Sequence, residues 1–243
     1  MKKGKILIGT SGWKYDHWNG TFYPEELKKK NQLDFFTQQF DTVELNNSFY
    51  RQPTASNFTS WYHQVPKGFI YSVKANRYFT HLKKLKVSGT DLDDFLSAAE
   101  GLKTALGPIL FQLPPKWKIN VERFKSFLEL LPKNFRYTFE FRETSWYHED
   151  IFNLLKEYNA AFCIYELGGH LSPVISTADF VYIRLHGPGA KYQGSYTDDS
   201  LCTWKEKCMD WANIGKDVYV YFDNDQLGYA AFNALKLKEL LKI

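Results

Sequence analysis

The stretch YTFEFRETSWYHEDIFNLLKEYNAAFCIYE, residues 137–166, predicts one strand–helix–strand unit. Residues 137–142 and 161–166 are short apolar runs rich in Phe and Tyr, which is typical of buried β-strands. Between them, residues 150–158 place apolar side chains at the three- and four-residue spacing of an amphipathic helix. A strand, a helix and a second strand in this order indicate two parallel strands joined by a crossover helix.

The same alternation continues in both directions along the chain. Further strands are predicted at residues 5–10, 42–46, 70–75, 108–113, 180–187 and 218–224. Further helices are predicted at residues 27–40, 57–63, 91–103, 121–131, 200–212 and 227–241. The segment 167–179, which includes Pro173, shows little helical period.

This alternation predicts an α/β fold, a single (β/α)8 TIM-type barrel, with residues 1–243 as one domain. An open Rossmann-type sheet is disfavoured because no G-x-G-x-x-G motif follows the first strand. No linker or low-complexity tract marks a second domain. The composition is that of a globular protein, with 44% hydrophobic and 18% aromatic residues. Such aromatic enrichment fits a bulky core, and it also fits a pocket that stacks ring-shaped ligands.

Charge and cysteine content limit the partners and the compartment. The net charge of +4 is too small to predict extended nucleic-acid binding, although it leaves an anionic ligand open. Cys163, Cys202 and Cys208 form no CxxC motif and leave an odd count, which disfavours a disulfide framework. The apolar run at residues 6–8 is too short for a signal peptide, and no segment is long enough to span a bilayer. We therefore expect a cytoplasmic protein with no membrane association.

Polar residues gather at the ends of the predicted strands. In a strand, residues two apart point to the same side, and three strands end in polar pairs of this spacing. These pairs are Glu44 with Asn46, Glu140 with Arg142 and Arg184 with His186, and the other polar strand ends are Lys74, Gln112, Glu166 and Asp223. Barrel enzymes place their active sites at this carboxyl-end face, so we expect a polar, cation-lined pocket there. Taken singly, Glu140 and Arg142 fit a structural ion pair better than a functional site, and His186 fits a hydrogen-bonded packing residue better than a catalyst. The convergence of polar groups from seven strand ends shifts the balance towards a functional pocket.

Two long loops could cover such a pocket. Residues 11–26 follow the first strand and contain Trp13. Residues 188–199 follow the seventh strand and contain Tyr196. Gly187 directly before this loop, and Gly189 and Gly194 within it, would let backbone amides approach an anion. Loops of this length in a compact domain are usually lids or binding loops.

Distinctive sequence blocks run along almost the whole chain. They are IGTSGWKY (8–15), FYP (22–24), TVELNNSFYRQP (42–53), VKANRYFTH (73–81), LGPILFQLPP (106–115), FEFRETSW (139–146), RLHG (184–187) and VYFDNDQLGYAAFNA (220–234). In these blocks and their order the chain resembles the YecE-like family, also called domain of unknown function 72. The resemblance implies a (β/α)8 barrel but supplies no reaction.

The resemblance also implies a set of characteristic positions that largely coincide with the polar strand ends. They are Glu44, Asn46, Tyr50, Lys74, Arg77, Thr80, His81, Gln112, Glu140, Arg142, Trp146, Arg184, His186 and Asn224. Two positions depart from the family pattern, because Glu166 stands where Asp is usual and Asp223 where Asn is frequent. Either change would alter the selectivity of a closely fitted pocket.

Two classes of function remain open from the sequence. The first is an enzyme acting on a small anionic or sugar- or phosphate-containing substrate, with Glu140 or Glu44 as general base and His186 as acid or proton shuttle. Its ligand-binding residues would be Trp13, Asn46, Tyr50, Lys74, Arg77, Gln112, Arg142, Trp146, Arg184, Tyr196, Asp223 and Asn224. The second is a non-catalytic protein that binds a metabolite or, with weaker support, nucleic acid.

A metal-dependent version of the enzyme is the minor alternative. The acidic strand ends and His186 are residue types that divalent-metal barrels use. Against a metal, the chain lacks a second convergent histidine and any H-x-H or H-x-x-x-H spacing, and the cations could neutralise the carboxylates instead. We assign no metal ligand and no certain cofactor, and the sequence gives no oligomeric state.

Overall fold

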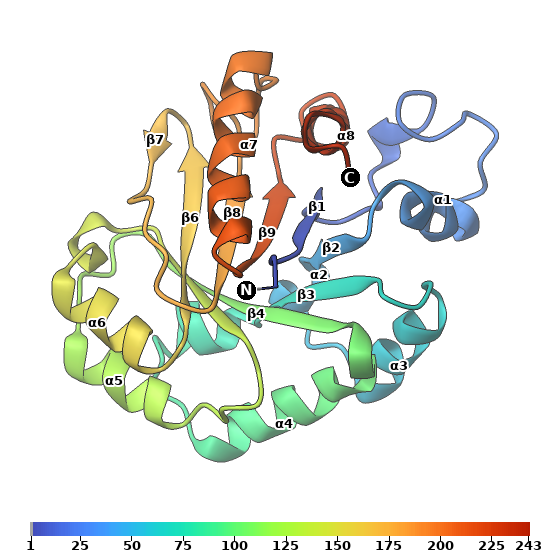
Figure 1. Ribbon diagram of the computed structural model, residues 1–243. Helices are drawn as coiled ribbons and strands as arrows, with labels where there is room; N and C mark the ends of the chain where they lie inside the picture. The colour runs from blue at the N-terminus through green and yellow to red at the C-terminus, as the bar shows by residue number, and fades with distance from the viewer. Residues whose placement is uncertain (1) are drawn as a thin grey trace. The chain divides into compact units, whose positions relative to one another are not determined.

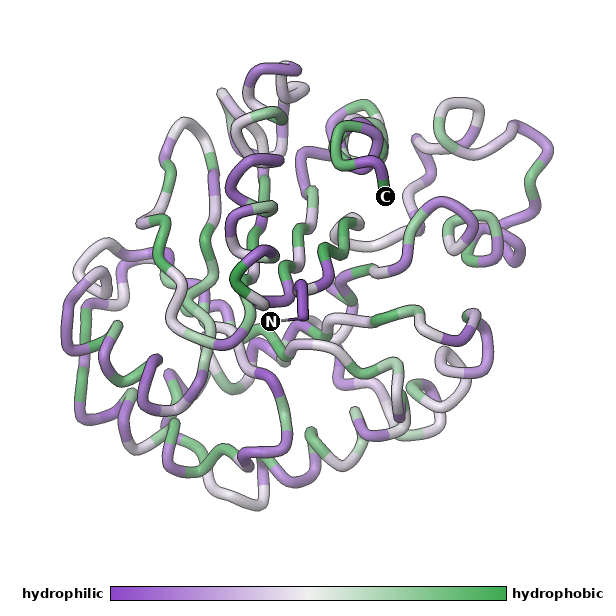
Figure 2. The backbone as a smooth tube through the Cα atoms, in the orientation of Figure 1, coloured by the Kyte–Doolittle hydropathy of each residue, from purple (hydrophilic) through white to green (hydrophobic). Residues whose placement is uncertain are grey.

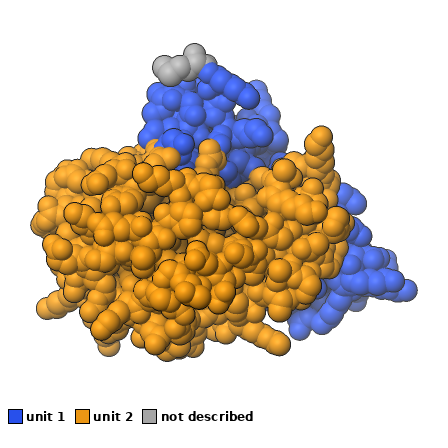
Figure 3. Space-filling view, turned by 90° about the horizontal axis from the view of Figure 1, so that it is seen from below, with its two compact units in different colours: residues 1–44, 164–174, 179–243 blue, residues 45–163, 175–178 orange. Residues whose placement is uncertain are grey.

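The computed structural model describes residues 2–243, and its helices and strands are labelled in Figure 1. The chain divides into two compact units, coloured separately in Figure 3. Unit 1 comprises residues 1–44, 164–174 and 179–243, and unit 2 comprises residues 45–163 and 175–178. The boundaries fall inside strands β2 (Thr42–Leu45) and β6 (Ala161–Leu167), so each of these strands contributes residues to both units.

Unit 1 is built on parallel strands with β9 (Asp217–Phe222) between β1 (Ile6–Thr10) and β8 (Phe180–Leu185). The register pairs Phe222 of β9 with Thr10 on one side and with Leu185 on the other. A parallel bridge joins Ser11 to Glu44 at the end of β2. The carboxyl ends of four strands therefore meet in register within this unit.

The helices of unit 1 are α1 (Gln32–Gln39), α7 (Asp198–Asn213) and α8 (Tyr229–Leu241). The helix predicted from residue 27 begins only at Gln32, after a short 3-10 turn at Lys29–Asn31. The apolar face of this helix starts at Leu33 and packs on Phe22, whereas the preceding lysines are exposed and have nothing apolar to bury. The segment of weak period contains the two-residue strand β7 (His170–Leu171), antiparallel to β6.

Unit 2 contains the parallel strands β3 (Ile70–Lys74), β4 (Leu106–Leu113), β5 (Tyr137–Phe141) and the first residues of β6, in that order. Its helices are α2 (Asn47–Tyr50), α3 (Ala55–His63), α4 (Gly89–Ala99), α5 (Val121–Glu129) and α6 (Glu149–Glu157). The sequence did not predict α2 or the π-helical turn Tyr78–Leu82, because a single turn leaves no readable period. The helix predicted over residues 91–103 starts two residues earlier, where Ser88 and Asp91 form a capping box, and continues past Ala99 as a 3-10 helix.

Side chains alternate between two environments along β5. Phe139 and Phe141 stack on each other at 6.4 Å between ring centroids and pack against Phe124 of α5. Thr138 and Glu140 point to the opposite side, as the two-residue period requires. Figure 2 shows hydrophobic and hydrophilic residues alternating along α5 and α6, whose apolar faces are buried. The strand residues that pack against the helices are therefore apolar, and the polar residues of the same strand lie on its other face.

Eight parallel strands alternate with helices along the described residues, except between β6 and β8, where β7 stands in place of a helix. This is the order of a (β/α)8 TIM-type barrel, so the predicted fold class is confirmed. The assignment of residues 1–243 to a single domain stays a prediction. Over residues 2–243, none of the helices combines the length and the apolar character that crossing a membrane requires.

Candidate functional site

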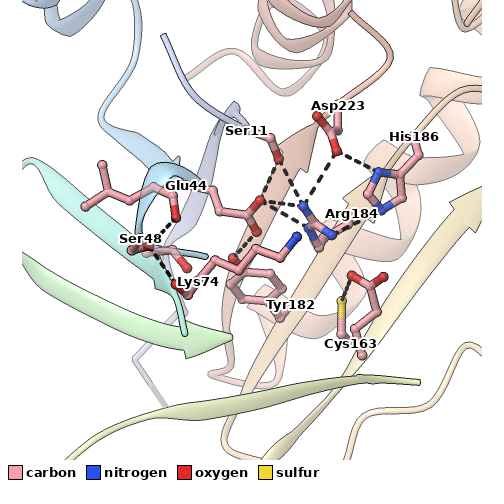
Figure 4. A network of polar contacts seen from close by, with 12 residues as sticks. Ser11, Glu44, Ser48, Lys74, Cys163, Tyr182, Arg184, His186 and Asp223 are labelled. Carbon is pink, nitrogen blue, oxygen red and sulfur yellow. Dashed lines mark hydrogen bonds and ion pairs between the residues drawn. The ribbon is translucent and has the colours of Figure 1, made fainter. Parts of the chain in front are cut away.

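The strand ends of unit 1 assemble a polar cluster, which we define as Ser11, Glu44, Tyr182, Arg184, His186 and Asp223 (Figure 4). Ser11 follows β1, and Glu44 lies opposite it across the bridge to β2. Leu185 at the end of β8 pairs in register with Phe222 at the end of β9. His186 directly follows Leu185, and Asp223 directly follows Phe222. The register of parallel strands therefore brings these residues together although they are far apart in the sequence.

Glu44 and Arg184 form a fully buried ion pair at the centre of the cluster. Arg184 donates to Oε1 of Glu44 from Nη2 at 2.7 Å and from Nε at 3.2 Å. The same carboxylate accepts hydrogen bonds from the Ser11 hydroxyl and the Tyr182 hydroxyl, each at 2.6 Å. Three side chains thus satisfy a carboxylate that is 0% exposed, which compensates for the cost of removing its charge from water.

His186 lies between a carboxylate and the guanidinium. Its Nδ1 atom is 2.9 Å from Oδ2 of Asp223, and its Nε2 atom is 3.3 Å from Nη1 of Arg184. A guanidinium can only donate, so Nε2 is the acceptor and Nδ1 carries the proton that is donated to Asp223. This arrangement fixes the neutral tautomer and the orientation of the imidazole.

The unit 1 cluster has an excess of negative charge. Arg184 also lies 3.6 Å from Asp223, so its one positive charge faces two carboxylates. Burial and then the nearby Asp223 and Asp225 raise the pKa of Tyr15, whose hydroxyl donates to the Ser11 carbonyl. Both effects keep the Tyr15 phenol protonated and available as a donor.

The loop after β8 is anchored by a second hydrogen-bond network. Asn224 donates from Nδ2 to the Gly194 carbonyl and to Oδ1 of Asn233, each at 2.8 Å. Oδ1 of Asn233 also accepts from the backbone amide of Tyr196 at 3.0 Å. Gly187 adopts φ +116°, and a Cβ there would lie 2.3 Å from the Gln193 carbonyl oxygen. The loop therefore has one defined path, which only glycine permits at its first turn.

This loop covers the imidazole of the cluster. The ring of Tyr192 meets that of His186 edge-on, with 5.4 Å between centroids, and the Tyr192 amide donates to the His186 carbonyl. His186 is 0% exposed, whereas Tyr192 is 46% exposed. The Tyr196 hydroxyl accepts from the Gly187 amide at 3.1 Å and bonds to Glu166, whose pKa is raised by burial. Tyr196 is accordingly part of the loop anchor.

The loop after β1 is attached to the end of β9 through Asp225. Trp18 donates from Nε1 to Oδ1 of Asp225 at 2.7 Å, and Nε2 of His17 lies 2.9 Å from Oδ2. Burial raises the pKa of Asp225 to about 6. Trp13 is buried in the same loop, and its carbonyl accepts from the Tyr23 hydroxyl at 2.5 Å.

Unit 2 assembles a second cluster of opposite charge, the cationic cluster Lys74, Arg77, His81 and Arg142. Lys74 ends β3, and Arg142 follows β5. Arg77 directly precedes the π-helical turn Tyr78–Leu82, and His81 lies within it. Burial, and then the positive charges of the other three residues, lower the pKa of His81. Glu140 is the carboxylate paired with Arg142, and it also accepts from the Cys163 thiol at 3.8 Å.

Local contacts hold the cationic cluster in place. Ser48 of α2 donates to the Lys74 carbonyl at 2.6 Å (Figure 4), and Asn76 donates to the Ser48 carbonyl at 3.0 Å. Lys74 lies over the ring of Phe49 at 4.5 Å, and His81 meets the same ring edge-on at 5.1 Å. The short helix α2 therefore fixes both Lys74 and His81.

The predicted site residues fall into distinct environments. The predicted residues Glu44, Arg184, His186 and Asp223 lie together in unit 1, and Lys74, Arg77, Glu140 and Arg142 lie together in unit 2. Gln112 pairs in register with Glu140, and Asn46 precedes α2 at the end of β2. Tyr50 is 74% exposed. The ring of Trp146, by contrast, is fully buried against Phe141.

Several residues of these clusters were missed by the sequence analysis. Tyr182 precedes Arg184 by two positions and so shares its side of β8, which the period of the strand could have indicated. Ser11, Phe49, Cys163 and Asn233 carried no comparable signal in the sequence. Within residues 2–243, no group of three or more His, Cys, Asp or Glu side chains is placed as metal ligands.

Comparison with known proteins gives a consistent match. The family described as "Protein of unknown function DUF72" matches residues 7–243. The chain is 25% identical to the UPF0759 protein YunF of Bacillus subtilis (strain 168), over 98% of this chain and 95% of that protein. A DUF72 family crystal structure from Thermotoga maritima MSB8 is 30% identical, with a TM-score of 0.88 over 98% of this chain and all of that one. A second, from Enterococcus faecalis V583, is 19% identical with a TM-score of 0.83 over 98% and 96% of the two chains.

Proposed function

This chain belongs to the DUF72 family, as its sequence blocks indicated, and we propose that it is an enzyme acting on a small anionic, sugar- or phosphate-containing substrate. We place the reaction at the carboxyl ends of the strands and assign it to general acid–base chemistry. The observation that carries this proposal is the His186–Asp223 pair, in which Nδ1 lies 2.9 Å from a carboxylate oxygen.

His186 is the best placed of the three predicted catalytic residues to move a proton. With Nδ1 protonated towards Asp223, Nε2 can accept a proton from a substrate hydroxyl once it gives up its 3.3 Å contact with Nη1 of Arg184, and Asp223 then stabilises the imidazolium. Glu44 is saturated by donors from three side chains, so we assign it to orienting Arg184. Glu140 is paired with Arg142, and as a base it would have to give up part of that pairing.

Substrate access in this proposal requires movement of the loop 188–199. His186 is fully buried beneath Tyr192, which is itself half exposed. The Tyr192 amide donates to the His186 carbonyl, whereas the Asn224–Asn233 network holds the part of the loop from Gly194 onwards. We expect the loop to open around Tyr192 and stay anchored at Tyr196.

The cationic cluster of unit 2, taken by itself, is suited to bind an anion. Arginine and lysine side chains recognise phosphate and carboxylate groups, and Arg77 is exposed. Cys163, Cys202 and Cys208 form no disulfide within residues 2–243, which supports a cytoplasmic location for this chemistry. No step of the proposed reaction needs a metal ion, and the divalent-metal alternative is left to the experiment below.

A second function is a non-catalytic protein that binds a metabolite or nucleic acid. The burial of Glu44, Arg184 and His186 favours it, because a fully satisfied ion-pair network is also a structural device. In that case the cationic cluster would bind the anion and the unit 1 cluster would only stabilise the fold.

A thermal-shift screen separates these functions. Purified protein would be heated with phosphorylated sugars, sugar acids, nucleotides and short oligonucleotides, each with a chelator and with added manganese, zinc or magnesium. A ligand at a hundred times its Kd stabilises the folded state by about 2.7 kcal/mol, so binding is visible. Stabilising ligands would then be incubated with protein and followed by NMR for product.

Turnover by the wild type that is lost in His186→Asn, with binding retained, is the result we expect. Binding without product formation by the wild type, under every metal condition, would contradict the enzyme and favour the binding protein. Stabilisation only when an anion and a metal are both present would favour the metal-dependent version. Glu140→Gln tests the other candidate base. If Glu140 is the base, this substitution should lower the turnover rate much more than the affinity for the ligand.

A further inference from the structure

A cavity of about 310 Å³ lies in unit 2, between the ends of two helices and the starts of two strands. One wall comes from the end of α5 and the turn after it, and another from the end of α6 and the turn before β6 (Figure 1). Tyr137, the first residue of β5, also lines the cavity. The cavity is therefore at the amino end of β5, whereas Glu140 and Arg142 are at the carboxyl end of the same strand.

The buried part of the lining is apolar and aromatic. Leu128 and Ala160 are each 1% exposed, and Leu131 and Phe135 are half-buried. The rings of Phe135 and Tyr137 lie 6.2 Å apart between centroids. At about 30 Å³ for each liquid water, the cavity has room for about ten waters, or for a ligand of about a dozen non-hydrogen atoms. Aliphatic and aromatic walls of this kind suit a flat, apolar ring.

The hydroxyl of Tyr137 is a polar group within this apolar lining. Tyr137 is 5% exposed, and its hydroxyl makes no hydrogen bond to other groups within residues 2–243. Buried hydroxyls in proteins almost always have a partner. Burial raises the pKa of Tyr137, so the hydroxyl keeps its proton and can both donate and accept. A hydroxyl on the inner end of a ligand would satisfy it.

Two charges of opposite sign lie on the rim of the cavity. Lys133 belongs to the turn after α5, and Glu157 is the last residue of α6, and both are exposed. The last carbonyl groups of α6 add partial negative charge beside Glu157. An ammonium group is favoured next to Glu157, and a carboxylate is favoured next to Lys133. The rim therefore fits the two charges of a zwitterion.

We propose that this cavity binds a free aromatic α-amino acid that carries a ring hydroxyl, of which tyrosine is the simplest. The ring packs between the apolar walls, and its hydroxyl bonds to that of Tyr137. The ammonium and carboxylate groups stay at the rim, beside Glu157 and Lys133. The site uses none of the residues at the carboxyl ends of the strands, so the inference goes beyond the proposed function and does not rest on it.

Titration of the full, isotope-labelled chain with four compounds, followed by amide NMR, tests the proposal. The compounds are tyrosine, phenylalanine, tyramine, which lacks the carboxylate, and hydroxyphenylpropionate, which lacks the ammonium group. We expect shifts of the amides around the cavity, and tyrosine should bind about fivefold more tightly than phenylalanine, because one hydrogen bond separates them. Loss of either charge should weaken binding by about threefold, since both rim charges are exposed.

Two substitutions assign the contacts. Tyr137→Phe should bind phenylalanine as the wild type does and lose the preference for tyrosine. This variant should be at least as stable in urea as the wild type, because the deleted hydroxyl has no partner to lose. Lys133→Met should bind tyrosine and tyramine with equal affinity. Lys125→Met, at an exposed position of α5 outside the cavity, should bind all four compounds as the wild type does.

The contrary outcomes are distinct from one another. No shift around the cavity with any of the four compounds at millimolar concentration overturns the site, and it leaves the proposed function untouched. Equal affinity of the wild type for tyrosine and phenylalanine overturns the role of Tyr137. Tighter binding of tyramine than of tyrosine overturns the zwitterion and indicates a site for amines.

Discussion

Nδ1 of His186 and Oδ2 of Asp223 lie 2.9 Å apart, at the ends of two adjacent parallel strands. Their positions follow from the register, in which the preceding residues Leu185 and Phe222 are direct neighbours. The pair defines the tautomer of an imidazole that also meets a guanidinium at 3.3 Å.

Asp223→Asn should change the tautomer of His186. The new amide can donate to Nδ1, which moves the ring proton to Nε2 and sets it against the donors of Arg184. Unfavourable donor–donor contact in a buried site costs about 1 to 3 kcal/mol. Nitrogen NMR of the His186 ring would show the tautomer, and urea denaturation would show the loss of stability. Asp210→Asn, on the exposed side of α7, is the matched control, and an unchanged His186 spectrum in Asp223→Asn would contradict the assignment.

Glu44→Gln should destabilise the protein strongly. It leaves the guanidinium of Arg184 buried without its closest carboxylate, and breaking a buried pair in this way costs about 3 kcal/mol. The measurement is the free energy of unfolding in urea. Glu239→Gln, in an exposed ion pair with Lys236, should leave that free energy nearly unchanged. Equal effects of the two substitutions would show that the buried pair contributes no more than a surface pair.

Gly187→Ala should displace the loop that covers His186. The new Cβ would meet the Gln193 carbonyl oxygen at 2.3 Å, in a backbone conformation that L-residues rarely adopt. We expect a loss of about 2 kcal/mol in stability and faster hydrogen exchange of the loop amides. Gly189→Ala, two residues further on, meets no atom within 4 Å and should change neither quantity. A folded Gly187→Ala protein with wild-type exchange would show that this turn is not constrained.

The free energy of unfolding of Asp225→Asn, taken relative to that of the wild type, should increase as the pH rises. Burial raises the folded-state pKa of Asp225 from 3.8 to about 6, so between these values the folded state binds more protons than the unfolded state. The contribution of Asp225 to stability is therefore present at low pH and is lost as the pH rises through about 6. The difference between variant and wild type should grow by on the order of 1 kcal/mol from about pH 4 to about pH 7, since partial exposure weakens the effect. A difference between variant and wild type that stays constant over this pH range would contradict the raised pKa of Asp225.

The strand ends show how far the sequence could predict the site. Each polar pair at positions i and i+2, such as Arg184 with His186, was readable because side chains in a strand alternate between two faces. The same two-residue period predicted that Phe141, between Glu140 and Arg142, faces the surrounding helices, and it packs against Phe124 of α5. The role of Trp146 was not readable, because nothing in the sequence distinguishes a ligand-stacking ring from one stacked on Phe141.

The partner of each charge was decided only by the tertiary structure. Glu44 and Arg184 are 140 positions apart, and their pairing depends on the order and register of strands that are not consecutive in the sequence. The positions of Phe49 and His81 depend on a one-turn helix and a π-helical turn, which are too short to leave a pattern.

By itself the sequence determined the family, the alternation of strands and helices, and the polar character of the strand ends. These properties rest on hydrophobic period and local propensity, which act over a few residues and leave a repeated signal. The tertiary structure decided that the polar residues form a carboxylate-rich cluster in unit 1 and a cationic cluster in unit 2. Within each unit, buried charges must find compensating partners, and only the folded register determines which partners lie within reach.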